Sequence, residues 1–182
     1  MSVIEQQAAT GTWQIDKVHS IAGFEVKHMV VATFRGGFED FGGGVEFEDG
    51  EARLTGYARA GSIAVRDENL AAHLQSPEFF DAEQHPEIRF ESTAVRRDGD
   101  ELTVEGDLTI KGITRRVEAR GAITDPHADA YGGTRLGVDL STVVDRTEFG
   151  LNWNQPLPKG GFALADDVKI VVHLEFVKIE AE

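Results

Sequence analysis

The chain has 182 residues, no cysteine and a formal net charge of -14. This length suffices for one domain with a substantial hydrophobic core, and the lack of cysteine excludes disulfides and thiol chemistry. A strongly acidic protein repels phosphate backbones and anionic lipid surfaces, which disfavours nucleic-acid binding and docking on such membranes by charge alone. No apolar run is long enough to span a bilayer, so we expect no stable membrane insertion.

No linker or break in composition divides the sequence. We therefore expect a loose N-terminal arm over residues 1–10 and a single domain over residues 11–182. The opening residues, MSVIEQQAAT, lack the basic region and apolar run of a signal peptide. Together with the absence of cysteine, this predicts a cytoplasmic protein.

The N-terminal region alternates apolar and polar side chains, as β-strands with one buried face do. A short strand is predicted at residues 12–16. In the strand that follows, Phe24, Val26 and His28 share one face. Glycines at positions 42–44 lack the helix, lysine and Ser/Thr of a phosphate-binding loop, and are more typical of bends in a curved or closed sheet.

The strand predicted after the first Asp-Gly turn has an unusual face. Ala52, Leu54, Gly56, Ala58 and Ala60 alternate along it, and four of these five residues are small. A strand of this kind leaves space on the side that its small residues line, which favours a cavity over a solid core.

The one convincing helical signal begins after Asp67. An aspartate at this position is a good N-cap, and Leu70 and Leu74 fall four residues apart on one helix face. The aromatic pair Phe79 and Phe80 follows. We expect this insert to act as a plug or lid on a sheet-built core, or as a connector whose aromatic side chains fill one end of it.

The remaining chain again alternates, in strands predicted at residues 88–95, 102–110, 113–123, 136–144 and 168–179. The long segment 145–161 is irregular, but its aromatic residues favour an ordered and functional loop. Eight to nine alternating strands without a second helical layer indicate an antiparallel sandwich or closed barrel. The glycine bends and the small-residue strand favour a barrel with a cavity.

Four motifs, in the same order, resemble the YceI-like, polyisoprenoid-binding family. They are Asp16…His19-Ser20…Phe24…Val26…His28, then Leu74…Ser76…Phe79-Phe80-Asp81…Pro86…Ile88…Phe90…Ser92, then Leu108-Thr109-Ile110-Lys111-Gly112-Ile113-Thr114, and Asp145-Arg146…Phe149-Gly150-Leu151. The resemblance extends from about residue 13 to residue 177. It implies an all-β fold, an extended eight-stranded antiparallel lipocalin-like β-barrel with a short helical insert. It also implies a long isoprenoid ligand, a polyprenyl chain or a quinone tail, and a homodimer; many relatives are exported.

Taken together, these features predict a non-catalytic protein that binds, stores or transports a long-chain isoprenoid lipid and requires no other cofactor. Two alternatives stay open: an isoprenoid-modifying enzyme that uses the same cavity, and a structural β-domain without ligand. An enzyme of this kind needs inward-facing carboxylates or a metal, and the predicted inward faces carry almost none. The expected ligand-binding residues are Phe24, Val26, His28, Leu54, Ala58, Phe79, Phe80, Phe90, Leu108, Val138, Leu140, Phe149, Trp153, Val172 and Leu174.

We expect structural roles for the other polar residues. The six histidines show no metal-binding spacing, so His28 is interpreted as a hydrogen-bonded interior histidine and no metal site is expected. Ser20 beside His19 is interpreted as a local turn cap and not as part of a catalytic triad. Asp145 and Arg146 are interpreted as an ion pair at the start of a loop.

The head group of the ligand is expected to be neutral. A pyrophosphate needs fixed cations, because an unpaired anion is costly to desolvate. The basic cluster at Lys111, Arg115 and Arg116 alternates with acidic residues and is typical of a solvated surface. A quinone needs only one or two donors, for which the candidates are His28, Asn152 and Trp153.

Overall fold

The computed structural model describes residues 10–180, so the predicted arm at residues 1–10 lies outside the described residues except for Thr10. The strands are β1 (Gly11–Ile15), β2 (Ile21–His28), β3 (Ala32–Phe38), β4 (Phe41–Glu48), β5 (Glu51–Arg59), β6 (Ile63–Ala64), β7 (Glu87–Asp98), β8 (Glu101–Ile110), β9 (Ile113–Ile123), β10 (His127–Ala128), β11 (Thr134–Asp145) and β12 (Leu164–Lys178). The helices are the 3-10 turns η1 (Ala60–Ser62) and η2 (Arg146–Phe149) and the α-helix α2 (Glu68–Gln75). Within this described part, no helix is long and apolar enough to cross a membrane.

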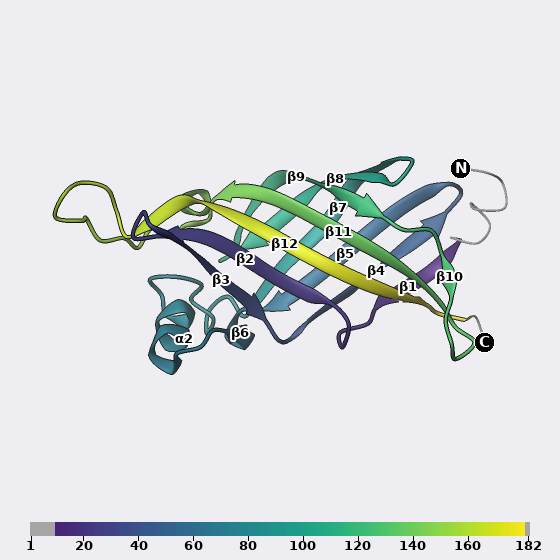
Figure 1. Cartoon of the computed structure of the whole chain (residues 1–182), viewed down its shortest axis with the longest axis horizontal. Helices are drawn as coiled ribbons and strands as arrows, with labels where there is room; N and C mark the ends of the chain where they lie inside the picture. Colours follow the sequence, from purple (N-terminus) through teal and green to yellow (C-terminus); the bar gives the residue numbers. More distant parts are fainter. Residues whose placement is uncertain (1–9, 181–182) are drawn as a thin grey trace.

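Eight strands close into an antiparallel barrel in the order β11-β9-β8-β7-β5-β4-β1-β12, with β12 pairing back onto β11 (Figure 1). The predicted eight-stranded barrel is therefore confirmed. The sheet continues from β12 through β2, β3 and β6 towards α2. The two-residue strands β6 and β10 were not predicted, because two residues are too few to show an alternating pattern.

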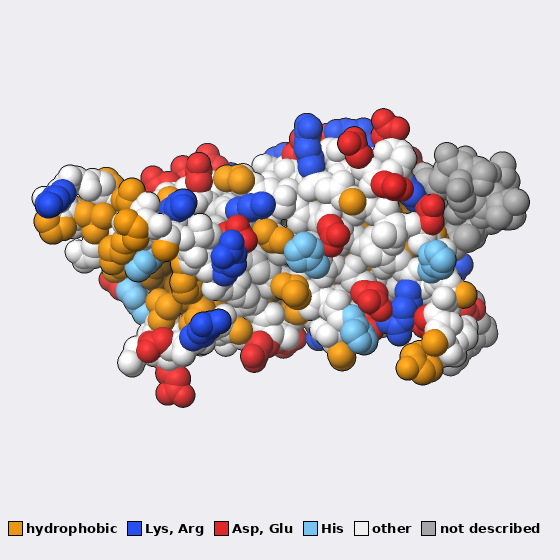
Figure 2. Space-filling model, viewed as in Figure 1, with side chains coloured by type: hydrophobic (Ala, Val, Ile, Leu, Met, Phe, Trp, Pro, Cys, Tyr) orange, Lys and Arg blue, Asp and Glu red, His pale blue; other side chains and the backbone are white. Residues whose placement is uncertain are grey.

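Alternation decides which side chains fill the barrel. In β8, Leu102, Val104, Leu108 and Ile110 are buried. Gly106 falls on the same face, where an added Cβ would lie 2.5 Å from the ring of Phe90 on β7. The ring therefore occupies the space that a side chain at position 106 would need. The outside of the barrel carries charged side chains of both signs (Figure 2).

The glycines at positions 42–44 serve the close approach of strands. Gly43 has a φ of +144°, and a Cβ there would lie 2.1 Å from the carbonyl oxygen of Thr55 on β5. A Cβ on Gly44 would lie 2.5 Å from the carbonyl oxygen of Trp13 on β1. Strand β4 can pair on both sides here only because these residues lack side chains.

The helical insert forms as its sequence indicates. The Asp67 carboxylate accepts a hydrogen bond of 2.8 Å from the backbone N–H of Leu70, which confirms the N-cap. Leu74 and Phe79 are buried in the same hydrophobic cluster as Phe149 of η2. The insert therefore packs its apolar side against the end of the barrel where β8 ends and η2 begins. We call this the α2 end.

The long loop after β11 is ordered by a buried cation. Arg146 is 5% exposed, and its guanidinium donates to the carbonyl oxygens of Ala165 at 2.9 Å, Leu151 at 2.5 Å and Trp153 at 2.9 Å. Its carboxylate partner is Asp166, at 3.4 Å. Arg146 therefore fastens the loop to the start of β12.

The predicted ion pair between Asp145 and Arg146 is wrong. The Asp145 carboxylate instead accepts bonds of 2.8 Å and 2.6 Å from the backbone N–H and hydroxyl of Thr147, and so caps η2. These hydrogen bonds hold the pKa of Asp145 below its usual value. Neighbouring residues often pair locally, but here burial of the arginine directed it to carbonyl oxygens.

Replacing Arg146 with methionine should lower the free energy of unfolding by roughly 3 kcal/mol, because the buried carbonyl groups lose their donors. Chemical denaturation measures this loss, and amide hydrogen exchange should rise across residues 150–163. Arg115→Met is the matched control, because Arg115 on β9 is exposed, and it should change the stability little. Unchanged exchange in the loop of Arg146→Met would contradict the assigned role.

Candidate ligand-binding cavity

The barrel holds a cavity of about 470 Å³ that extends to the α2 end. This volume lies within the range of small-molecule sites. Its walls are the inward faces of the strands, and α2, the Phe79–Phe80 pair, η2 and Trp153 contribute to it. Fourteen of the expected ligand-binding residues line it: Phe24, Val26, His28, Leu54, Ala58, Phe79, Phe80, Phe90, Leu108, Leu140, Phe149, Trp153, Val172 and Leu174.

Val138 does not line this cavity. It borders a second one, of about 530 Å³, together with Leu102, Val104 and Leu136. Leu54 borders both cavities. The alternating pattern of β11 correctly predicts that Val138 faces inward. It does not predict the height of the residue along the barrel axis. Its assignment to the main cavity is therefore corrected.

An aromatic cluster joins the helical insert to the long loop. The ring of His73 on α2 meets Phe79 and Trp153 edge-on, with centroids 5.0 Å and 5.1 Å away, and the Phe79 and Trp153 rings lie 5.4 Å apart. One ring nitrogen of His73 lies 2.6 Å from a carboxylate oxygen of Glu78. His73 lines the cavity although it was absent from the expected residues. Its position next to Leu74 in the helix was the only signal.

The polar residues predicted for a head group lie near the α2 end, but not all as expected. His28 lines the cavity but is exposed, so its interpretation as an interior histidine is wrong. It is the last residue of β2 and pairs with Leu164, where the sheet ends. Asn152 is exposed and is not among the lining residues, whereas Trp153 is.

The cavity wall contains no aspartate or glutamate among the described residues. Of its two arginines, Arg146 is committed to backbone carbonyl groups and Arg89 pairs with Glu87. A wall of this composition can bury a long apolar molecule. It offers no carboxylate for general acid–base catalysis or for metal coordination.

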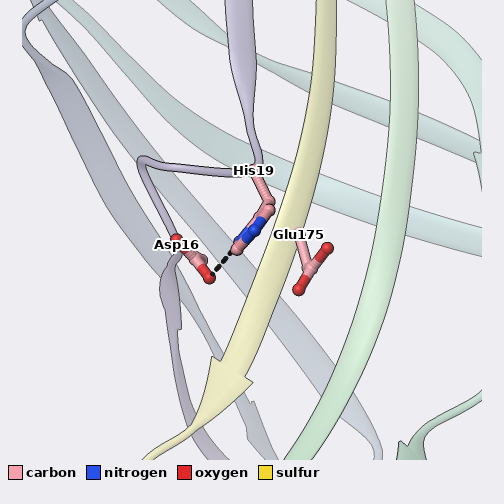
Figure 3. Close-up of side chains that lie close together, drawn as sticks. All are labelled: Asp16, His19 and Glu175. Carbon is pink, nitrogen blue, oxygen red and sulfur yellow. Dashed lines mark hydrogen bonds and ion pairs between the residues drawn. The ribbon is translucent and has the colours of Figure 1, made fainter. Parts of the chain in front are cut away.

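A second group of functional side chains lies at the turn between β1 and β2. Figure 3 shows Asp16, His19 and Glu175, whose ligand atoms lie within 4.8 Å of one another, as a metal site would require. However, the Arg135 guanidinium already donates to Asp16 at 2.8 Å, to Asp129 at 2.8 Å, and to Glu175. Arg135 therefore already occupies carboxylate oxygens that a cation would need, and the cluster fits a structural clasp better than a cation site.

Hydrogen bonds from His19 and Arg135 hold the pKa of Asp16 far below its usual value, and the Asp16 carboxylate raises the pKa of His19. Ser20 is buried, and its hydroxyl accepts a hydrogen bond of 2.9 Å from the backbone N–H of Glu175 on β12. The interpretation of Ser20 as a local cap is thus corrected, because its hydroxyl connects the turn before β2 to β12. The Asp-x-x-His-Ser motif fixes the barrel corner where β1 gives way to β2.

Asp16→Asn should destabilise the protein most between about pH 4 and about pH 6.5. The stability contributed by Asp16, whose folded pKa is lowered, is present above the ordinary carboxyl pKa and is lost as the pH falls towards the lowered value. Protonated His19 also contributes to the free energy of unfolding. Because the pKa of His19 is raised in the folded protein, this contribution is lost as the pH rises through the raised value.

Thermal melts of wild type and Asp16→Asn across the pH range would measure this window. His19→Gln is the matched variant, and it should remove the loss at high pH while the loss at low pH remains. A difference in melting temperature that is independent of pH would contradict the clasp.

Comparison with known proteins agrees with this architecture. The chain is 34% identical over 168 residues to a UPF0312 protein of Staphylococcus aureus strain N315, a match that covers 88% of this chain and 94% of the relative. The structure of Burkholderia cenocepacia BcnA superposes with a TM-score of 0.75 at 22% identity, covering 88% of this chain and 98% of that one. A polyisoprenoid binding domain from Saccharophagus degradans, implicated in plant cell wall breakdown, superposes with a TM-score of 0.70 at 10% identity over 92% of this chain and 98% of that domain. The family model of the YceI-like domain matches residues 13–176, and the chain therefore belongs to the YceI-like family.

Proposed function

We propose that this protein binds a long-chain isoprenoid lipid in the main barrel cavity and stores or transports it without chemical change. The observation that carries the proposal is the cavity wall, in which mostly apolar side chains from strands, helix and loop surround about 470 Å³. Among residues 10–180, no carboxylate lines it. A saturated or isoprenoid chain has no polar atoms to satisfy, so such a wall suits it. The similarity to a polyisoprenoid binding domain supports the same ligand class.

The energetics are adequate for a carrier. Each buried CH₂-sized group contributes about 0.8 kcal/mol, so a few isoprene units offset the cost of ordering the chain. No directional contact along the tail is required. The small side chains of Gly56 and Ala58 on β5 leave room for the tail beside Phe41 and Phe90.

An isoprenoid-modifying enzyme is a weaker candidate for the same cavity. Cyclising or transferring an isoprenoid requires acidic residues or a metal at the reacting carbon. In the described residues the nearest approach to a metal site is the group of Asp16, His19 and Glu175. Arg135 already pairs with its carboxylates, and its three residues do not line the cavity. Within the wall, burial lowers the pKa of Arg146, whose guanidinium donates to backbone carbonyl oxygens.

We further propose a neutral quinone head group in preference to a polyprenyl phosphate. Two basic residues of the β8–β9 hairpin, Lys111 and Arg116, are already engaged. The Lys111 ammonium donates to the carbonyl oxygens of Pro77 at 2.6 Å and Gly150 at 3.3 Å, and Arg116 pairs with Asp107 at 3.1 Å. A phosphate would have to displace these partners, whereas a quinone carbonyl needs only a donor such as the indole of Trp153.

Competitive loading tests the head group. Delipidated protein is incubated with an isoprenoid quinone and a polyprenyl phosphate of equal tail length, at two salt concentrations. The bound lipid is then extracted, and each species is quantified by mass spectrometry. We expect the quinone to be preferred at both salt concentrations, because its binding involves no charge. Preferential uptake of the phosphate, weakened by salt, would reverse the assignment and point to the arginines.

Ala58→Trp tests the site itself. Ala58 lies on the inner face of β5, so an indole there fills the volume proposed for the tail. The variant should retain its β-sheet circular dichroism and bind at least tenfold less lipid, a change of about 1.4 kcal/mol. Ala52→Trp is the matched control, because Ala52 lines the second cavity only. Full lipid load in Ala58→Trp would show that Ala58 does not border the bound lipid.

A further inference from the structure

Exposed apolar side chains gather at the end of the molecule where β2 meets β3 and the long loop folds back (Figure 2, left). We call this surface the apolar rim and define it as Met29–Val31 with Pro156–Phe162. Val30 is 64% exposed, Val31 83% and Phe162 58%. Single exposed apolar residues are ordinary, but a cluster of this kind marks an interaction surface.

The two parts of the rim form one surface. The backbone N–H of Met29 donates to the carbonyl oxygen of Ala163 at 2.7 Å. A Cβ on Gly161 would lie 3.5 Å from a methyl carbon of Val30. The rim also adjoins the cavity, because His28 and Leu164, which pair next to it, both line the cavity wall. A lipid tail leaving the cavity at this end would meet the rim.

The turn that carries the rim is conformationally strained. Met29 has a φ of 51° and Val30 a φ of 66°, both in the left-handed region. Asn-Gly is the preferred pair for such a turn, and a β-branched residue there is an outlier. Asn-Gly would form this turn with less strain than Met29-Val30 and would expose less apolar surface. The presence of Met29 and Val30 here is therefore better explained by a contact with a partner.

The charge of the rim indicates the kind of partner. The chain contains 32 aspartates and glutamates, yet none falls in segments 26–38 or 149–165, and Lys159 is the only charged residue of the rim itself. By contrast, the α2 insert at the same end carries Glu78, Asp81 and Glu83. An apolar surface with one lysine suits the zwitterionic head-group region of a bilayer, where amphipathic and aromatic side chains settle. The acidic insert disfavours anionic lipid.

We propose that the apolar rim docks reversibly on neutral bilayer surfaces, with Val31 and Phe162 entering the interface and the cavity turned towards the membrane. The purpose of docking, collection and delivery of a membrane lipid, rests on the proposed function, but the docking itself does not. Contact through a few side chains is shallow and reversible, and it differs from stable insertion.

Vesicle co-sedimentation with the full chain tests the docking. The vesicles are phosphatidylcholine without any isoprenoid. The wild-type protein should co-sediment, and Val31→Ser/Phe162→Ser should lower the partition coefficient about tenfold. Tyr131→Ser is the matched control, because Tyr131 is 92% exposed in the turn between β10 and β11, outside the rim. Adding phosphatidylglycerol should weaken binding, and salt should restore it.

A second variant separates docking from folding. Met29→Asn/Val30→Gly relaxes the turn, so it should raise the melting temperature while it lowers vesicle binding. Unchanged binding of this variant, or wild-type protein that does not sediment with vesicles, would overturn the proposal. So would a concentration-dependent dimer that the same variant abolishes, since a second copy would then be the occupant.

The proposed function is measured separately, by loading quinone from ethanol in the absence of vesicles. The rim variants should load normally from ethanol yet take up at least tenfold less quinone from vesicles. If the wild-type protein takes up no quinone from ethanol, the proposed lipid binding is contradicted. The vesicle result for docking would still hold.

Discussion

Closure of the sheet along β12 is the constraint on which the rest of the structure depends. This strand pairs with β11 over most of its length, from Asp167 to Val177. On its other edge it pairs with β2 and then with β1, so two short strands share one long partner. The chain must turn between β1 and β2. Asp16 and His19 pair within that turn, and Arg135 binds Asp16 from β11 and so holds it in place. A barrel without free edges at this point avoids pairing with other chains.

Closure also determines what the interior can do. Once the apolar faces of eight strands are directed to one lumen, its wall is mostly apolar, and the few polar residues on its strands include Tyr57, Arg89 and Thr142. The wall of the main cavity accordingly has no carboxylate among the described residues, and His28, His73 and Trp153 belong to elements at its α2 end. The barrel is thus suited to hold an apolar molecule.

The α2 end combines ordered and exposed structure. Buried Arg146 fixes the base of the long loop through carbonyl oxygens, and the Asn154 side chain pairs with both backbone polar groups of Leu164. Beyond these anchors the loop presents Phe162 to solvent. A fixed base allows apolar side chains to be displayed without collapsing into the cavity, and this is what a surface that handles lipid requires.

The sequence by itself determined the long strands, most of their inward faces and the helix start at Asp67, because periods of two and four follow directly from backbone geometry. Alternation placed ten of the fifteen expected residues on the cavity wall, and four more that line it come from the helical insert, η2 and the long loop: Phe79, Phe80, Phe149 and Trp153. Only the tertiary structure decided how far each residue lies along the barrel, and therefore assigned Val138 to the second cavity. It also decided that Arg146 would serve carbonyl groups and that Arg135 would join Asp16 and Glu175, since these partners are distant in sequence. Local patterns specify direction within one strand, whereas position and partnership arise only when the sheet closes.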